Sequence, residues 1–170
     1  MLPSAILLVL TISAGAYWLW SALSSNHPIV AVVRFDNETA DPQMTRFSDG
    51  LTDNVVEQLT SRSNGRYMVV GNARILRLAR EQRDLGALAS SLHANYVVLG
   101  QVQRNNGHTR ILAHLIRLPE QTHLWVSKLD LTLDDPLGAE SEMAKKVADE
   151  FSPRVFTDSH GHPLPSLGSH

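Results

Sequence analysis

The order of apolar and polar residues separates a long uncharged segment at the amino end from a patterned body. Residues 2–33 contain no Asp, Glu, Lys or Arg, and the apolar core of this stretch runs from Ser4 to Leu23. A helix of that length, at about 1.5 Å per residue, just spans a hydrocarbon core of about 30 Å. Aromatic residues, which favour the headgroup level, gather toward its carboxyl end at Tyr17, Trp18 and Trp20. We therefore predict a transmembrane signal anchor over residues 1–24, followed by a linker at 25–28.

A cleaved signal peptide is the alternative interpretation of this segment, because Ala22-Leu23-Ser24 forms a small-x-small site. The apolar core is long for a signal peptide, so we favour retention in the membrane. No Lys or Arg precedes the segment, although positive charge normally marks the cytoplasmic side. One explanation is that Met1 is not the natural start and that a cytoplasmic part belongs upstream.

The body, residues 29–152, alternates strand-like and helix-like patterns. Continuous β-branched or apolar runs predict buried strands, and strict alternation predicts a strand with one covered face. Such runs occur at 29–33, 67–70, 96–103, 110–118 and 123–133. Apolar residues at helical spacing follow Asp41-Pro42, Asn72, Asp84 and Asp135-Pro136. The predicted order is β-α-β-α-α-β-β-β-α, an α/β module with a mixed sheet of about five strands.

Turn and capping residues predict where these elements begin and end. Asn64-Gly65 offers a left-handed stop to the first long helix, and Asp84 offers an N-cap to a later one. Asn106-Gly107 is the strongest hairpin signal in the chain. Pro153 predicts the end of the last helix, and the Gly-, Pro-, Ser- and His-rich residues 153–170 predict a disordered tail.

Several short motifs in the body carry a family resemblance. They are the strand Ile29–Phe35 with Asn37, the segment Phe47–Thr52 with its Asp-Gly-Leu-Thr, Tyr96–Val102, Ile111–Ile116 and His123-Leu124-Trp125. In this order they make the body resemble the TolB amino-terminal-like domain. That domain is found behind the membrane segment of many ToxR/CadC-like transmembrane regulators and in related bacterial envelope proteins. The resemblance implies an extracytoplasmic, non-catalytic interaction or sensory domain, and it brings no catalytic residues with it.

Composition and charge exclude several classes of protein. The 170 residues are 43% hydrophobic and 19% charged, which is enough apolar material for a core. There are no cysteines, so disulfide scaffolds, Cys zinc sites and Cys nucleophiles are excluded. The net charge of −2 offers no basic surface, so we expect no nucleic acid to be bound by this chain itself.

Two sets of charged residues are candidates for a partner surface. Asp36 and Glu38 follow the first strand, where α/β proteins place their ligand loops. With Asp41 they could hold a cation, but a solvated turn is the more common reason for such a cluster. The second set is Arg74, Arg77 and Arg80, which with Arg83 recur every three residues. On one helix they would form a basic stripe facing solvent, anionic lipid or an acidic partner.

No catalytic motif stands out, so we predict that the protein is not an enzyme and has no cofactor or metal site. Gly-x-Ser-x-Gly, a phosphate-binding loop and His-Glu-x-x-His are all missing from the sequence. Asp49 and Gly50 are interpreted structurally, with Gly50 letting its helix approach the sheet. Eight histidines raise a pH-sensing alternative, which we rank below ordinary half-buried polar groups.

The sequence therefore predicts a single-pass protein of the bacterial inner membrane with a binding or sensory domain in the periplasm. Its partner would be an envelope protein or a small ligand. It could form the C-terminal part of a ToxR/CadC-like transmembrane transcriptional regulator. The alternative is a stand-alone envelope-assembly or scaffold protein.

Overall fold

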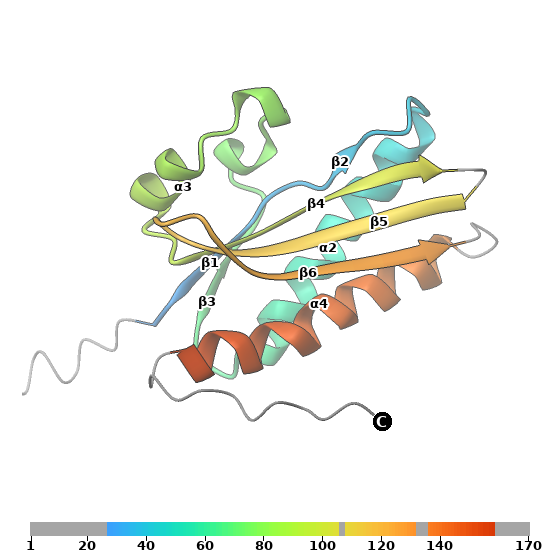
Figure 1. The fold of residues 1–170 in the computed structure, drawn as a ribbon. Coiled ribbons are helices and arrows are strands. Elements are labelled where there is room, and N and C mark those ends of the chain that lie inside the picture. Colours follow the sequence, from blue (N-terminus) through green and yellow to red (C-terminus); the bar gives the residue numbers. More distant parts are fainter. Residues whose placement is uncertain (1–26, 106–107, 132–135, 159–170) are drawn as a thin grey trace, which may run out of the picture.

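The computed structural model describes residues 27–105, 108–131 and 136–158, which form a mixed α/β domain (Figure 1). Its sheet has six strands in the order β3-β1-β4-β5-β6, and the short β2 pairs with β4. The strands are β1 (Ile29–Val32), β2 (Asp36–Asn37), β3 (Met68–Val70), β4 (Tyr96–Asn105), β5 (His108–Arg117) and β6 (Thr122–Leu131). The helices are α2 (Gln43–Ser63), α3 (Leu85–Leu92) and α4 (Pro136–Asp158), with the 3-10 turns η1 (Arg74–Arg77) and η2 (Arg80–Gln82).

The sheet has a parallel half and an antiparallel half. β1 pairs in parallel with β3 and with β4, whereas β4, β5 and β6 form an antiparallel meander. Residues 30–33, at the centre of the parallel half, are fully buried. Strands covered on both faces need apolar side chains at every position, which is why this run does not alternate.

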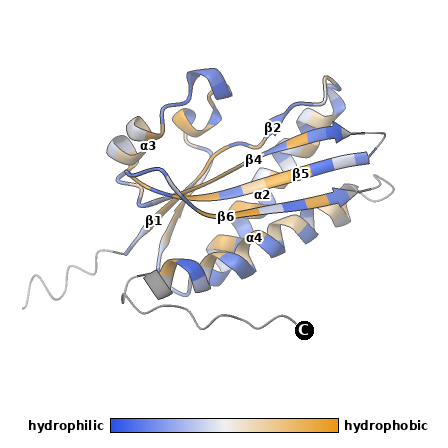
Figure 2. Cartoon of the chain, viewed as in Figure 1, coloured by the Kyte–Doolittle hydropathy of each residue, from blue (hydrophilic) through white to orange (hydrophobic). Residues whose placement is uncertain are grey.

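Helices cover the two faces of the sheet unequally. α2 and α4 pack side by side against one face, and their apolar stripes close the larger core around Phe35, Leu51 and Phe151. α3 and the 3-10 turns cover part of the other face, around Leu76 and Leu88. Figure 2 shows hydrophobic residues along the middle of the sheet, with polar residues toward the far ends of the long strands.

The local signals at the element ends are largely confirmed. Asn64 caps α2 in the left-handed conformation, with φ 45° and ψ 36°. The Asp84 side chain caps α3 by accepting hydrogen bonds from the backbone N–H groups of Gly86 and Ala87. Asn106 and Gly107 lie outside the described residues, but β4 and β5 pair antiparallel up to Asn105 and His108, as a tight hairpin requires.

Three features differ from the sequence prediction. A sixth strand, β2, is present because residues 36 and 37 pair with Gln101 and Val102 of β4. The single helix predicted after Asn72 is replaced by two 3-10 turns, since Leu78 and Ala79 between them are extended. α4 continues through Pro153 to Asp158, because it keeps Val155 buried in the same core as Phe151.

The predicted membrane anchor, the linker up to residue 26 and the tail beyond residue 158 lie outside the described residues. Within the described ranges, none of the helices combines the length and the apolar character needed to cross a membrane.

A candidate binding groove at the end of strand β1

A groove of about 410 Å³ lies where β1 leaves the centre of the sheet. One wall is residues 34–38 with Thr45, and the other is residues 77–81 between and within the 3-10 turns. The groove sits at the carboxyl ends of parallel strands, a common ligand position in open α/β sheets. Of the five predicted surface residues, Asp36, Glu38, Arg77 and Arg80 line it, while Arg74 is exposed at the start of η1 and does not.

Buried residues from the motifs that carry the TolB-like resemblance fix the floor of this groove. Phe35 is fully buried, and its backbone N–H donates to the Thr52 hydroxyl at 3.0 Å. That hydroxyl in turn donates to the Ser48 carbonyl at 2.7 Å. Gly100 leaves room for the Phe35 ring, because a Cβ at Gly100 would lie 2.2 Å from a Phe35 ring carbon. Thr52 and Gly100 therefore shape the groove indirectly, because Thr52 holds the backbone of Phe35 and Gly100 leaves room for its ring.

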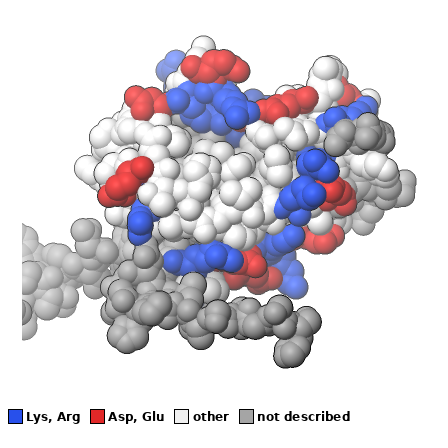
Figure 3. Space-filling view, viewed as in Figure 1, with Lys and Arg blue, Asp and Glu red and all other residues white. Residues whose placement is uncertain are grey.

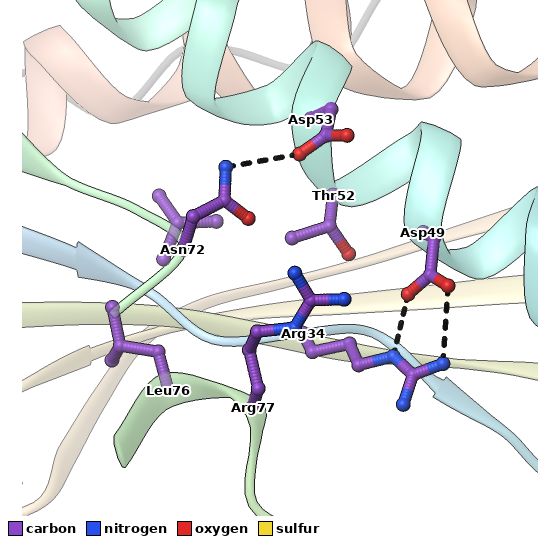
Figure 4. A pocket seen from close by; sticks show the side chains of 8 residues that line it. Arg34, Asp49, Thr52, Asp53, Asn72, Leu76 and Arg77 are labelled. Atoms are coloured by element: carbon purple, nitrogen blue, oxygen red, sulfur yellow. Dashed lines mark hydrogen bonds and ion pairs between the residues drawn. The ribbon is translucent and has the colours of Figure 1, made fainter. Parts of the chain in front are cut away.

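Arg34 joins the groove to α2 through a two-point ion pair. Its guanidinium donates to the two carboxylate oxygens of Asp49, at 2.6 and 3.2 Å (Figure 4). Asp49 thus has a structural role, as expected. The prediction for Gly50 needs correction, because Gly50 makes room for the Glu140 carboxylate of α4 and not for the sheet.

Asp36 is held by Arg83, and this pair overturns the idea of a solvated stripe that includes Arg83. The Arg83 guanidinium donates to both Asp36 oxygens, at 2.6 and 2.9 Å, and to the Leu78 carbonyl at 3.1 and 2.9 Å. Only 6% of the Arg83 side chain and 21% of the Asp36 side chain are exposed. The pair ties the extended Leu78 to the chain that follows β1, which explains why a continuous helix does not form there.

Glu38 is held by Arg80 in an exposed ion pair. The Gln103 amide also donates to Glu38, at 3.0 Å, and Arg80 donates to the Gln101 side chain at 2.9 Å. The two predicted acidic residues are therefore already engaged by arginines. Within the described ranges, no three His, Asp or Glu side chains cluster as a metal ion would need.

Arg77 lies between the groove and a second cavity of about 20 Å³, room for roughly one water molecule. Figure 4 shows it opposite Thr52 and Asp53 of α2, beside Asn72, whose amide donates to Asp53 at 3.2 Å. Arg34 also lines both cavities. The sequence did not reveal Arg34 as the partner of Asp49, or Arg83 as the partner of Asp36. For Arg34 a signal was present, because it is a lone charge directly after a buried β-branched strand.

Glu140 and His114 are among the titratable groups outside the groove whose pKa values are shifted. Burial raises the pKa of Glu140 above its ordinary value, and the Asn54 amide, 3.1 Å from its carboxylate, opposes the shift. Burial and the neighbouring His123 ring, 5.4 Å away between centroids, lower the pKa of His114. Neither group lines the groove, although the charge of Arg80, which does, also lowers the pKa of His114. pH sensing by the histidines stays the lower-ranked alternative.

Comparison with known proteins places the fold but not a family. No protein-family model matches the chain. A protein of Rhizobium meliloti named "Putative adenylate cyclase 3" is 28% identical over 120 residues, which is 71% of this chain. The match spans one fifth of that protein, so this chain corresponds to only a small part of its length.

Solved structures share the architecture at low identity. The PelC dodecamer of Paraburkholderia phytofirmans matches with a TM-score of 0.52 and 17% identity, over 72% of this chain and 86% of that chain. Lipoprotein GNA1162 of Neisseria meningitidis matches with a TM-score of 0.50 and 14% identity, over 73% of this chain and 99% of that chain. TolB of Acinetobacter baumannii also matches, at a TM-score of 0.44 and 20% identity over 73% of this chain and 28% of that chain. At these identities the likeness concerns the fold alone.

Proposed function

We propose that the described domain is a non-catalytic binding or sensory module of the bacterial envelope that engages its partner through the groove beside β1. The observation that carries this proposal is the arrangement of the groove. Its walls are positioned by buried residues, while exposed charged side chains at its rim stay accessible to a partner. Polar surface loops on a rigid α/β scaffold are where binding residues concentrate.

The state of the carboxylates supports binding over catalysis. Asp36, Glu38 and Asp49 each accept hydrogen bonds from an arginine of the same chain. A general base or nucleophile needs a carboxylate free to reach the substrate, and these three are committed to holding the groove together. The function must be argued from this site, since one fold hosts many functions.

The setting of the module has two candidate forms, each favoured by a different observation. Its relative in Rhizobium meliloti is about five times the length of the matching part, which favours a module attached to other domains, such as a ToxR/CadC-like regulator anchored in the inner membrane. In PelC and GNA1162 the shared fold makes up most of the chain, which favours a stand-alone envelope or scaffold protein. The lipoprotein nature of GNA1162 supports an extracytoplasmic location in either form.

Site-specific photo-crosslinking of the full chain in envelope membranes tests the proposal. A photoreactive residue at the exposed groove position Ala79 should form adducts, and replacing Arg74, Arg77 and Arg80 together by Gln should weaken them. Arg46→Gln serves as the matched control, because Arg46 is exposed on α2 and does not line the groove. Adducts that persist in the triple variant would reject this surface. Turnover of a substrate that depends on Asp36, Glu38 or Asp49 would reject the binding function itself.

A further inference from the structure

Four arginines border the groove or its walls, and three of them are already paired inside the chain. Arg34 is bound to Asp49, Arg80 to Glu38 and Arg83 to Asp36. The fourth, Arg77, is exposed, and among residues 27–105, 108–131 and 136–158 its side chain has no hydrogen-bond or ion-pair partner. A guanidinium offers a planar fork of donors that matches a carboxylate or a phosphate in a two-point contact.

The wall that carries Arg77 also carries a negatively charged residue, Glu81. Glu81 of η2 lines the groove, is exposed, and has no partner of its own within those same three ranges. The charged residues that line the groove are Arg34, Arg77 and Arg80 against Asp36, Glu38 and Glu81, so they balance. Figure 3 shows positive and negative side chains adjoining one another at the upper edge of the domain, where the 3-10 turns lie in Figure 1.

The balanced charge of the groove argues against a nucleic acid or an anionic lipid surface as its ligand. A nucleic acid or an anionic lipid surface is attracted by an excess of positive charge, and here each approaching phosphate would also meet carboxylates. The groove also lies at the far end of β1 from residue 27, where the predicted anchor would enter. β1 runs from Ile29 to Val32 and the groove follows it, so the groove lies at the opposite end of this strand.

The walls of the groove also argue against a small apolar molecule. Small-molecule sites are mostly apolar and enclose most of the ligand, whereas these walls are built largely from charged and polar side chains open to solvent. An extended protein segment needs less enclosure and can present charges of both signs.

We infer that Arg77 and Glu81 form the recognition pair of the groove, and that they bind a mixed-charge segment of a protein partner. Arg77 receives an Asp or Glu carboxylate, and Glu81 receives a Lys or Arg of the same segment. This inference rests on the proposed binding function and names the chemistry of its partner.

Selection of displayed twelve-residue peptides on the full chain tests the inference. Enriched sequences should carry an acidic and a basic residue at a constant spacing, and a synthetic peptide of that sequence is the probe. Arg77→Gln should weaken its binding roughly tenfold, the size of one charge-assisted hydrogen bond. Arg46→Gln, at an exposed arginine outside the groove, should leave the binding unchanged.

A charge exchange makes the assignment specific. The double variant Arg77→Glu with Glu81→Arg should lose the original peptide and bind one with its acidic and basic residues exchanged. Full affinity in Arg77→Gln, failure to enrich any peptide, or binding of inorganic phosphate in place of peptide would each overturn the inference. The crosslinking from Ala79 tests the proposed binding function independently. If Ala79 forms adducts and Arg77→Gln leaves them unchanged, the recognition pair is rejected and the binding function is not.

Discussion

Removing the Arg83 side chain should destabilise the domain because it would leave a mostly buried carboxylate unpaired. Arg83 makes two hydrogen bonds to Asp36, at 2.6 and 2.9 Å, and two to the Leu78 carbonyl. Arg83→Met keeps an apolar side chain at this position but removes the guanidinium. Asp36, with 21% of its side chain exposed, then loses its cation. Breaking a buried ion pair costs about 3–5 kcal/mol, and the partial exposure of Asp36 places the expected loss near 3 kcal/mol.

Further variants separate the ion pair from simple packing. Arg83→Lys keeps the charge but lacks the planar fork, so about half of that loss should remain. In the double variant Asp36→Leu with Arg83→Met both charges are gone, and most of the stability should return. Arg154→Met is the matched control, because Arg154 and Glu150 form a half-exposed pair on α4, which is much more open to solvent than the Asp36–Arg83 pair and whose loss should cost about 1 kcal/mol or less.

Urea unfolding followed by circular dichroism measures these free energies of unfolding. The reasoning is refuted if Arg83→Met costs less than about 1 kcal/mol, since the pair would then behave as a solvated one. It is also refuted if the separate effects of Asp36→Leu and Arg83→Met add in the double variant, because additive effects would show that Asp36 and Arg83 do not interact.

Two further predictions concern the buried carboxylate of Glu140 and the close approach at Gly100. Because burial raises the pKa of Glu140, the contribution of this carboxyl group to the free energy of unfolding should be greatest where it is protonated and should decline as pH rises through that pKa. Glu140→Gln should remove this decline in urea unfolding followed from acidic to neutral pH, whereas exposed Glu142→Gln should not. Gly100→Ala should cost about 1–3 kcal/mol, because its Cβ would lie 2.3 Å from the Leu112 carbonyl oxygen as well as against Phe35. Gly86→Ala in α3 should cost less, because its Cβ would meet only the Asp84 carboxylate, at 3.2 Å; a neutral Gly100→Ala would refute the close approach.

Local signals predicted most of the elements because they depend on neighbours in sequence. The β-branched run from Ile29, the Asn64 stop and the Asp84 cap each depend on residues a few positions apart, and the structure confirms them. Where a local rule failed, a long-range contact outweighed it. Pro153 breaks helices in isolation, but burial of Val155 on the larger core continues α4 past it.

The sequence by itself determined the α/β class, five of the six strands and several of the charged residues that line the groove, namely Asp36, Glu38, Arg77 and Arg80. Only the tertiary structure decided how those charges are used. Arg77, Arg80 and Arg83 look equivalent at a spacing of three residues, yet one is unpaired within the described ranges, one is paired at the surface and one is buried. The difference arises because Asp36 and Glu38, about forty residues earlier in the chain, come to lie beside them when β2 pairs with β4. No periodicity in the sequence encodes that juxtaposition, since it depends on the sheet bringing distant segments together.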